Sequence, residues 1–389
     1  MDDAYGCGGS QTPAPAPFTL RQAMTQQYEL ELHAPALTGI AGTDSRLARN
    51  VPALIPKEPG SAQRLLKPRA QKAQPSLLPP EAIAFDAFRL TLVQCRWHIT
   101  ANVAAAVETR EVEALHQLRV ALRRLRVALA SFGGEFRTPE LEAIKLRAKS
   151  LTNLLAPARD LDVFTGELLE PAANANGAHD AFAVLRARAE AARAKAWNDA
   201  VVVIAGPRFR MFMADLADIV DRGAWPHALV HGRGASKSVS AFEAPAQRVA
   251  ERMLAHRQCQ ACKKARRLEA LSVADRHELR IRLKKLRYTS EFFAPFFERA
   301  RVEKFVTRLS RMQDILGALN DVAVAKKTLD TLISESTPGE GRAESDISFA
   351  AGIVYGWHLE RAAHTWRDAV KRWKKFASTR EFWTPGAAQ

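Results

Sequence analysis

The sequence predicts an all-α protein made of two similar helical bundles that follow a largely irregular N-terminal arm. Three observations support this class. Apolar residues recur at spacings of three and four from about residue 81 onward, proline interrupts the first 80 residues, and one long helical segment occurs twice. The breaks between helical stretches place a first bundle at 81–225, a second at 240–377 and a short tail at 378–389.

The arm, residues 1–80, contains the proline-rich stretches PAPAPF, IPKEP and LLPPE and shows no helix-length apolar period. We therefore expect no packed helical domain there. YELELHA at 28–34 alternates apolar and charged residues as a strand does, although a lone strand has no stability without partners. The acidic start MDDAYGCGG lacks the basic and apolar regions of a signal peptide, so we expect a cytoplasmic protein.

Helical patterning begins after the arm. Phe85, Phe88 and Leu92 are spaced by three and four residues, and so are Leu118 and Leu122. Glycine- and proline-rich points predict where the helices break, namely at 133–134, 170–179, 206–207, 225–238 and 336–346.

An internal repeat is the strongest feature of the sequence. HQLRVALRRLR at 116 recurs as HELRIRLKKLR at 277, an offset of 161 residues. The same offset holds without a gap from 116–163 to 277–324, where it pairs Phe132 with Phe293 and Asp160 with Asp321. A repeat of this length contains a whole supersecondary unit, so we expect the two bundles to be related by a pseudo-twofold axis.

The formal net charge is +15, from 57 Lys and Arg against 42 Asp and Glu. Such an imbalance favours a polyanionic partner, and nucleic acid, anionic lipid and polyphosphate are all candidates. The longest apolar runs are far shorter than the roughly 20 residues that span a bilayer, so we expect no membrane insertion. The four cysteines are too few and too scattered for a disulfide framework or a convincing zinc site, and we expect no metal and no cofactor.

Each copy of the repeat carries a row of basic residues on one face of its helix, with leucines on the face beside it. The rows are His116, Arg119, Arg123 and Arg126 in the first copy and His277, Arg280, Lys284 and Arg287 in the second. Charged helix faces normally interleave acids at i,i+4, and these rows contain none. The simpler interpretation is that these basic residues only face solvent. Two rows without acidic partners favour an anion-binding site.

Other positions extend the candidate site. Arg147 and Arg308 occupy matching places one helix later in each copy. Further candidate contacts, near the rows or in the last helix, are Arg124, Lys263, Lys285, Tyr288, Arg361 and Lys371. We expect Asp160 and Asp321 to orient an arginine or cap a helix.

We expect no enzymatic activity. His116 and His277 titrate in a range suited to acid–base catalysis, but no serine, cysteine or paired carboxylate recurs beside them. The sequence also contains no G-x-x-x-x-G-K phosphate-binding loop. Tyr288 is the only aromatic residue close to either row, whereas single-stranded nucleic acids are held by stacking as well as by charge. A thin chain of phosphates without bases therefore fits better, and a nucleic-acid or nucleoid-binding protein remains the alternative.

The repeats, together with LLAPARDLDV (154–163), MQDILGALNDVAV (312–324) and GIVYGWHLERAA (352–363), closely resemble the CHAD family, the conserved histidine α-helical domain. The resemblance covers about residues 81–377. It implies two four-helix bundles with pseudo-twofold symmetry, a basic surface with a central pore, and binding of inorganic polyphosphate. It also implies a place on polyphosphate granules, with granule proteins as further partners, and it assigns ligand contacts to both rows and, less directly, to Arg147 and Arg308.

The arm resembles a second family. YELELHAPALTGI with SAQRLL (61–66) looks like the last strand and tail of a CYTH domain, which would place a CYTH-like remnant at about 28–66. That fold needs a closed barrel and an N-terminal E-x-E-x-K motif, and the sequence has neither. We therefore expect no triphosphatase activity.

Overall fold

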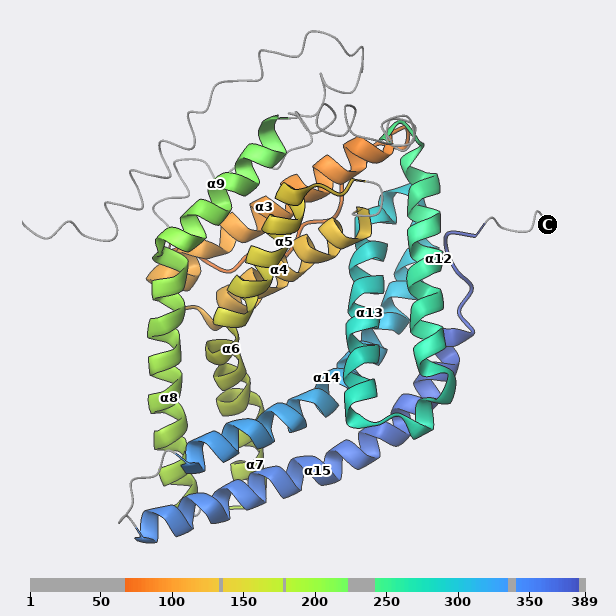
Figure 1. Ribbon diagram of the computed structural model, residues 1–389. Helices are drawn as coiled ribbons and strands as arrows, with labels where there is room; N and C mark the ends of the chain where they lie inside the picture. Colours follow the sequence, from red (N-terminus) through yellow and green to blue (C-terminus); the bar gives the residue numbers. More distant parts are fainter. Residues whose placement is uncertain (1–66, 133–135, 178–179, 223–241, 335–340, 385–389) are drawn as a thin grey trace, which may run out of the picture. The chain divides into compact units, whose positions relative to one another are not determined.

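The computed structural model describes residues 67–132, 136–177, 180–222, 242–334 and 341–384, without side chains for 341–344. The described residues are helical almost throughout and contain no β-strand, which confirms the all-α prediction (Figure 1). The predicted strand at 28–34 and the CYTH-like segment at 28–66 lie outside the described residues.

The first half of the fold contains a series of helices joined by short turns. These are α3 (Ala84–Glu108), α4 (Val112–Phe132), α5 (Pro139–Leu154), α6 (Ala156–Val163), a π-helical turn (Phe164–Leu169), α7 (Glu170–Ala175), α8 (Asp180–Ala205) and α9 (Pro207–Arg222). The second half has fewer and longer helices. These are α12 (Ala246–Lys264), a 3₁₀ segment (Ala265–Ala270), α13 (Val273–Phe293), a 3₁₀ turn (Ala294–Phe296), α14 (Arg299–Ser334) and α15 (Gly341–Ala377).

The two halves differ where the first half contains proline. The bounds of α4 and α13 are related by the offset of 161, and α14 covers the positions equivalent to α5 and α6. Proline lacks the backbone N–H that a helix interior needs, so Pro157 and Pro207 begin new helices. The repeat equivalent of Pro157 is Ala318, and α14 runs on unbroken there.

The predicted helix breaks agree with the structure in part. The break at 206–207 is confirmed, since α8 ends and α9 begins there. The prediction of a break over 170–179 is wrong at its start, because the chain stays helical through Ala175. The break predicted over 336–346 extends too far, since α15 begins at Gly341. The breaks at 133–134 and 225–238 lie outside the described residues.

Pseudo-twofold symmetry is visible where residues meet their own repeat equivalents, as they do at a twofold axis. The rings of Phe132 and Phe293 contact each other edge to face, with centroids 5.6 Å apart. The chains before α3 and α12 exchange hydrogen bonds as well. Ala84 N–H donates to the Ala244 carbonyl at 2.8 Å, and Ala246 N–H donates to the Ala82 carbonyl at 2.9 Å.

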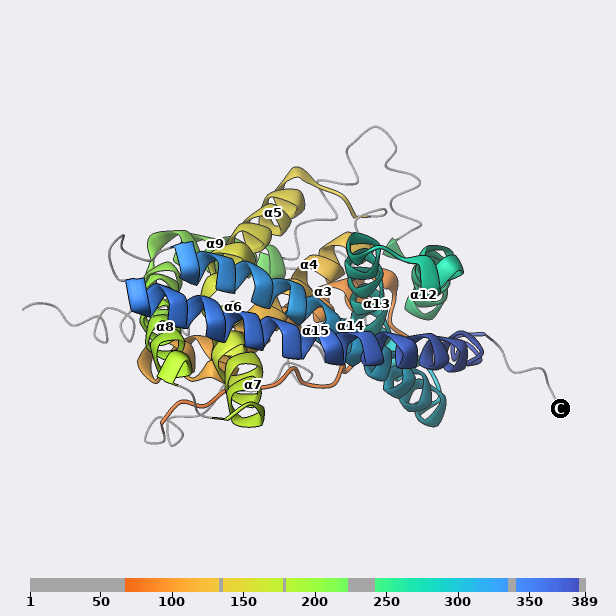
Figure 2. The same cartoon turned by 90° about the horizontal axis from the view of Figure 1, so that it is seen from below.

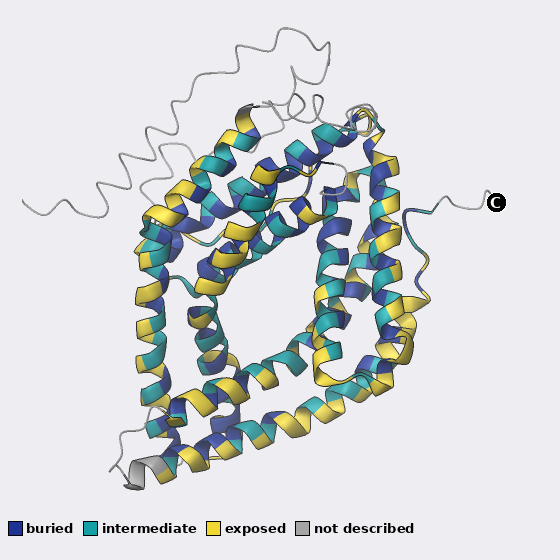
Figure 3. Ribbon diagram, in the orientation of Figure 1, coloured by how far each residue is buried: buried dark blue, intermediate teal, exposed yellow. Residues whose placement is uncertain are grey.

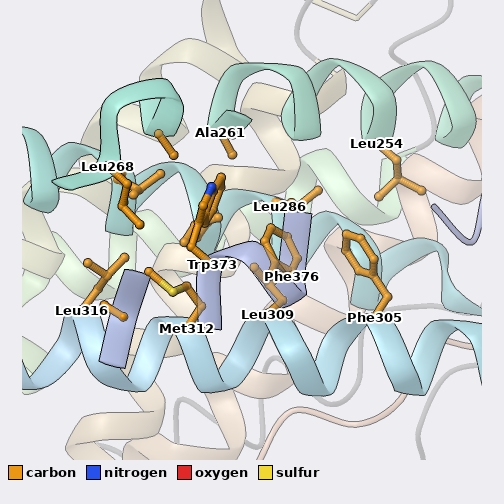
Figure 4. Packing of buried hydrophobic residues seen from close by; sticks show 14 of the residues in the cluster. Leu254, Ala261, Leu268, Leu286, Phe305, Leu309, Met312, Leu316, Trp373 and Phe376 are labelled. Carbon is orange, nitrogen blue, oxygen red and sulfur yellow. The ribbon is translucent and has the colours of Figure 1, made fainter. Parts of the chain in front are cut away.

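The longest helices link two hydrophobic cores. One core lies between α12, α13, the first part of α14 and the end of α15, and it contains Leu309 and Phe376 (Figure 4). Another lies between α7, α8, the end of α14 and the start of α15, and it contains Leu329 and Ala350. Both α14 and α15 contribute residues to each core, and they lie side by side near α7 and α8 (Figure 2). Second-half helices therefore complete a core that first-half helices begin. The bundle limits 81–225 and 240–377 stay predictions.

The helices α4 and α13 show the burial pattern that their sequences predict. Leu118, Leu122 and Leu125 of α4 are fully buried, as are the equivalent leucines of α13. Except for His277, which is exposed, the basic residues of the two rows are half-buried. Each helix therefore turns one buried face to the core and has less buried residues beside it (Figure 3). None of the described helices combines the length and the apolar character that crossing a bilayer would require.

Phe132→Ala should lower the free energy of unfolding by about 3–5 kcal/mol, because it leaves a cavity where the halves meet. The Phe132 ring is fully buried and stacks on Phe88 with centroids 4.7 Å apart. Urea unfolding followed by circular dichroism measures the change. Leu146→Ala is the control, since Leu146 is 62% exposed and its truncation should cost less than about 0.5 kcal/mol. Equal losses would show that Phe132 does not hold the halves together.

Candidate functional site

The two basic rows meet through a pair of repeat-equivalent residues, Arg123 of α4 and Lys284 of α13. Burial, followed by the positive charge of Arg123, lowers the pKa of Lys284 to about 6. No hydrogen bond or ion pair joins either side chain to another residue in the described part of the chain. Two half-buried basic side chains therefore lie within electrostatic reach of each other near the pseudo-twofold axis, and no acid pairs with either one directly. Lys284 is largely neutral near pH 7.

Arg119 and Arg280 flank this pair in the two halves. Burial lowers the pKa of Arg119 to about 10, and its Nη1 donates to the Thr152 carbonyl at 3.0 Å. Burial also lowers the pKa of Arg280, whose Nε is enclosed and finds no acceptor among the described residues. An enclosed donor without a partner is costly, so this guanidinium is suited to an external anion. We call the following five residues the central cluster: His116, Arg119, Arg123, Arg280 and Lys284.

Asp160 and Asp321 also form a repeat-equivalent pair, and their charges influence Arg119 and Arg280 respectively. Burial raises the pKa of both carboxyl groups, while Arg119 opposes this at Asp160 and Arg280 opposes it at Asp321. Neither makes a direct ion pair within the described residues. Both lie inside helices, in α6 and α14, so neither caps a helix. The two carboxyl groups influence the pKa values of Arg119 and Arg280 but form no ion pair with them.

The two histidines occupy different environments. Burial, followed by the charge of Arg159, lowers the pKa of His116 to about 4, so this ring is neutral near pH 7. His277 is exposed, and its Nδ1 lies 2.6 Å from the side-chain oxygen of Asn320. Arg159 and Asn320 are themselves related by the repeat offset. The first half therefore adds a cation beside its histidine where the second half has an amide.

Glu291 neutralises part of the candidate surface. Arg124 is buried, forms an ion pair with Glu291, and packs its guanidinium 4.9 Å from the centre of the Phe292 ring. Arg287 also lies beside this acid, with its Nε 3.2 Å from Oε1. The acid-free stretch in the second copy ends at Ser290, one residue before Glu291. The charge of Arg124 is thus already matched, and we leave it out of the candidate contacts.

The remaining candidates lie around the central cluster or away from it. Arg126 and Lys285 are half-buried, and the pKa of each is lowered first by burial. Tyr288 is buried, 5.4 Å from the Arg287 guanidinium.

Arg147 and Arg308 are engaged with neighbouring helices. Arg147 forms an ion pair with Asp215 of α9, and Arg308 donates to Thr379 Oγ1 at 2.8 Å. The exposed candidates on α12 and α15 are Lys263, Arg361 and Lys371. Among the described residues, no hydrogen bond or ion pair joins any of these five to the central cluster.

Arg159 is a site residue that the sequence reasoning missed. It lies on α6 and influences the pKa of His116, Arg119 and the two aspartates, Asp160 and Asp321. Its Nη2 also pairs with Glu167 at 3.3 Å. The repeat offset gave no signal for it, since the equivalent residue is Asn320. The signal in the sequence was its position directly before Asp160, a residue that the repeat had already selected.

Comparisons with known proteins agree with this fold. The family model of the CHAD domain matches residues 91–330, which contain both basic rows. The crystal structure of the CHAD domain from the plant Ricinus communis is similar, with a TM-score of 0.67 and 26% identity over 80% of this chain and 98% of that chain. PptA from Streptomyces chartreusis shares the fold, with a TM-score of 0.52 and 17% identity over 75% of this chain and 100% of that one. No curated protein matches the chain in sequence.

Lys284→Met should raise the free energy of unfolding at pH 7 by at least about 1 kcal/mol, since one pKa unit corresponds to about 1.36 kcal/mol. The folded pKa of about 6 lies below the ordinary value of 10.5, so unfolding takes up a proton between these values. Stability of the natural protein should therefore rise with pH through that window, and the variant should lack this part of the rise.

Urea unfolding at pH 7 and pH 9 tests this, with Lys371→Met on the exposed face of α15 as the matched control. A lower free energy of unfolding for Lys284→Met at pH 7 would contradict the argument that burial of the Lys284 amino group destabilises the folded protein.

Proposed function

Because the chain belongs to the CHAD family, we propose that it binds inorganic polyphosphate through the central cluster, with Arg126 and Arg287 at the edge. The observation that carries the proposal is the meeting of Arg123 and Lys284 at the pseudo-twofold axis, half-buried and without a direct acidic partner. Burial and the charge of Arg123 favour the neutral form of Lys284. A bound polyanion favours the protonated form, so binding restores the positive charge of this side chain.

The chemistry of the side chains suits phosphate. Guanidinium groups present several donors in a planar fork that matches phosphate oxygens, and an ammonium group acts as a mobile point charge. Each phosphate of the chain carries about one charge, so a row of cations spaced along two helices provides successive contacts. His116, neutral near pH 7, adds hydrogen bonding rather than charge.

We propose binding without catalysis. His116 has no serine or cysteine partner by hydrogen bond within the described residues, and the half-buried Asp160 and Asp321 lie under the influence of arginine and lysine charges. Incubation of the protein with polyphosphate and Mg²⁺ or Mn²⁺ should release no orthophosphate above the rate without protein. A metal-dependent release that Arg123→Ala abolishes would replace binding by hydrolysis.

Changing Arg119, Arg123, Arg280 and Lys284 together to Ala should abolish retention on immobilised polyphosphate while leaving the circular dichroism spectrum helical. A charge-matched control changes four exposed cations elsewhere, Lys149, Arg266, Lys304 and Arg311. Both variants lose the same formal charge, so general attraction weakens equally. Similar retention by the two variants would reject the central cluster as the binding site.

Salt dependence gives a second readout. Binding of a phosphate backbone releases counterions, so the logarithm of the association constant should fall linearly with the logarithm of salt concentration. The slope should be steep for the natural protein and shallower by about the number of lost contacts in a variant with fewer cluster cations. A salt-independent affinity would argue against a charge-driven site.

Nucleic acid is the second candidate, since basic side chains also bind its backbone. Competition separates the two. If single-stranded DNA or RNA displaces long-chain polyphosphate at equal phosphate concentration, the result favours nucleic acid as the ligand. We expect weak displacement, because Tyr288 is buried and offers no stacking surface at the rows.

A cytoplasmic place on polyphosphate granules, in contact with other granule proteins, follows from the proposed binding. A fluorescent fusion of the natural chain should collect on granules, and the fourfold alanine variant should spread through the cell. Collection of that variant on granules would assign recruitment to a part of the chain other than the central cluster.

A further inference from the structure

A second group of cations lies at the far end of the first basic row. Burial lowers the pKa of Lys285, and after burial the lowering comes from the positive charges of Arg257, Arg126, Arg282 and Lys145, in that order. These residues come from α4, α5, α12 and α13, so four helices contribute to one basic region. Of these residues, only Arg126 and Lys285 are predicted as contacts from the sequence, because the residues on α5 and α12 belong to no repeated row.

A hydrogen bond fixes the position of α12 in this region. Arg257 Nη2 donates to Ser131 Oγ at 3.3 Å, which joins α12 to the last turn of α4. Burial lowers the pKa of Arg257 as it does that of Arg126. The guanidinium of Arg257 is therefore held beside the end of the basic row instead of being free in solvent.

Acids neutralise only part of this region. Lys145 pairs with Glu142 at 3.0 Å, and Arg282 pairs with Glu278 at 2.5 Å. Within the described residues, no ion pair involves Arg126, Arg257 or Lys285. We call these three unpaired cations, with Lys145, the outer cluster.

The outer cluster continues the central cluster. The charge of Arg123 lowers the pKa of Arg126, one turn farther along α4, and Arg126 in turn influences Lys285 on α13. Arg123 is also the residue that couples most strongly by charge to Lys284. Arg123 and Arg126 lie on α4, Lys284 and Lys285 are neighbours on α13, and these two helices pack against each other. The central and outer clusters therefore adjoin along the same helix pair.

We propose that one polyphosphate chain runs from the central cluster past Arg126 onto the outer cluster, so that affinity increases with chain length. This inference rests on the proposed function. A short oligomer fills one cluster at a time, whereas a long chain reaches both, and the second contact becomes intramolecular with a high effective concentration. The outer cluster then sets the chain-length preference.

The test uses Arg257→Gln with Lys285→Gln in the full chain. In calorimetry with tripolyphosphate, the natural protein should bind about two molecules and the double variant about one. With chains of about 100 phosphates, the double variant should bind at least about tenfold more weakly than the natural protein. The exposed pair Lys149→Gln with Arg266→Gln loses the same charge and should bind long chains like the natural protein.

A conservative variant, Arg257→Lys with Lys285→Arg, keeps the charges and should retain the long-chain affinity, which separates loss of charge from loss of folding. Unchanged long-chain binding by the double glutamine variant overturns the outer cluster while leaving the central cluster in place. Failure of the natural protein to bind either oligomer rejects the proposed function itself. If the double variant loses single-stranded DNA and keeps polyphosphate, the outer cluster serves nucleic acid and the inference is wrong.

Discussion

Arg123 and Lys284 lie within electrostatic reach of each other at the pseudo-twofold axis, although both side chains can carry positive charge. Apolar packing holds them there. The leucines beside them on α4 and α13 are fully buried, and the Phe132 and Phe293 rings contact each other between the halves. Burial of these apolar side chains stabilises the arrangement by several kcal/mol, which offsets the repulsion between the cations. The rows therefore stay close whether or not an anion is bound.

Much of the fold could be predicted from the sequence, because helices depend on interactions between residues close together in the chain. Apolar spacing gives helices, and the repeat gives two related halves, as the matching bounds of α4 and α13 show. The sequence did not show that α14 and α15 run unbroken and complete a core with α7 and α8. That arrangement depends on contacts between residues more than a hundred positions apart, which apolar spacing along one helix does not reveal.

The candidate site was predicted to the extent that it follows the repeat. Arg119, Arg123 and their equivalents were found because one helical period places them on one face. Glu291 was missed as a partner because it reaches Arg124 from the other half of the chain. Arg159 and Arg257 were missed because neither stands in a repeated row, and only tertiary packing brings them near one.

The pseudo-twofold relation between α4 and α13 also bears on the kind of polymer that suits the site. A nucleic-acid strand has a direction, and turning it end for end presents different groups to the protein. A linear polyphosphate consists of identical units and reads the same from either terminus. In the proposed complex, repeat-equivalent residues such as Arg119 and Arg280 would meet the same kind of oxygen in both orientations. A ligand without polarity would then have two equivalent ways to bind.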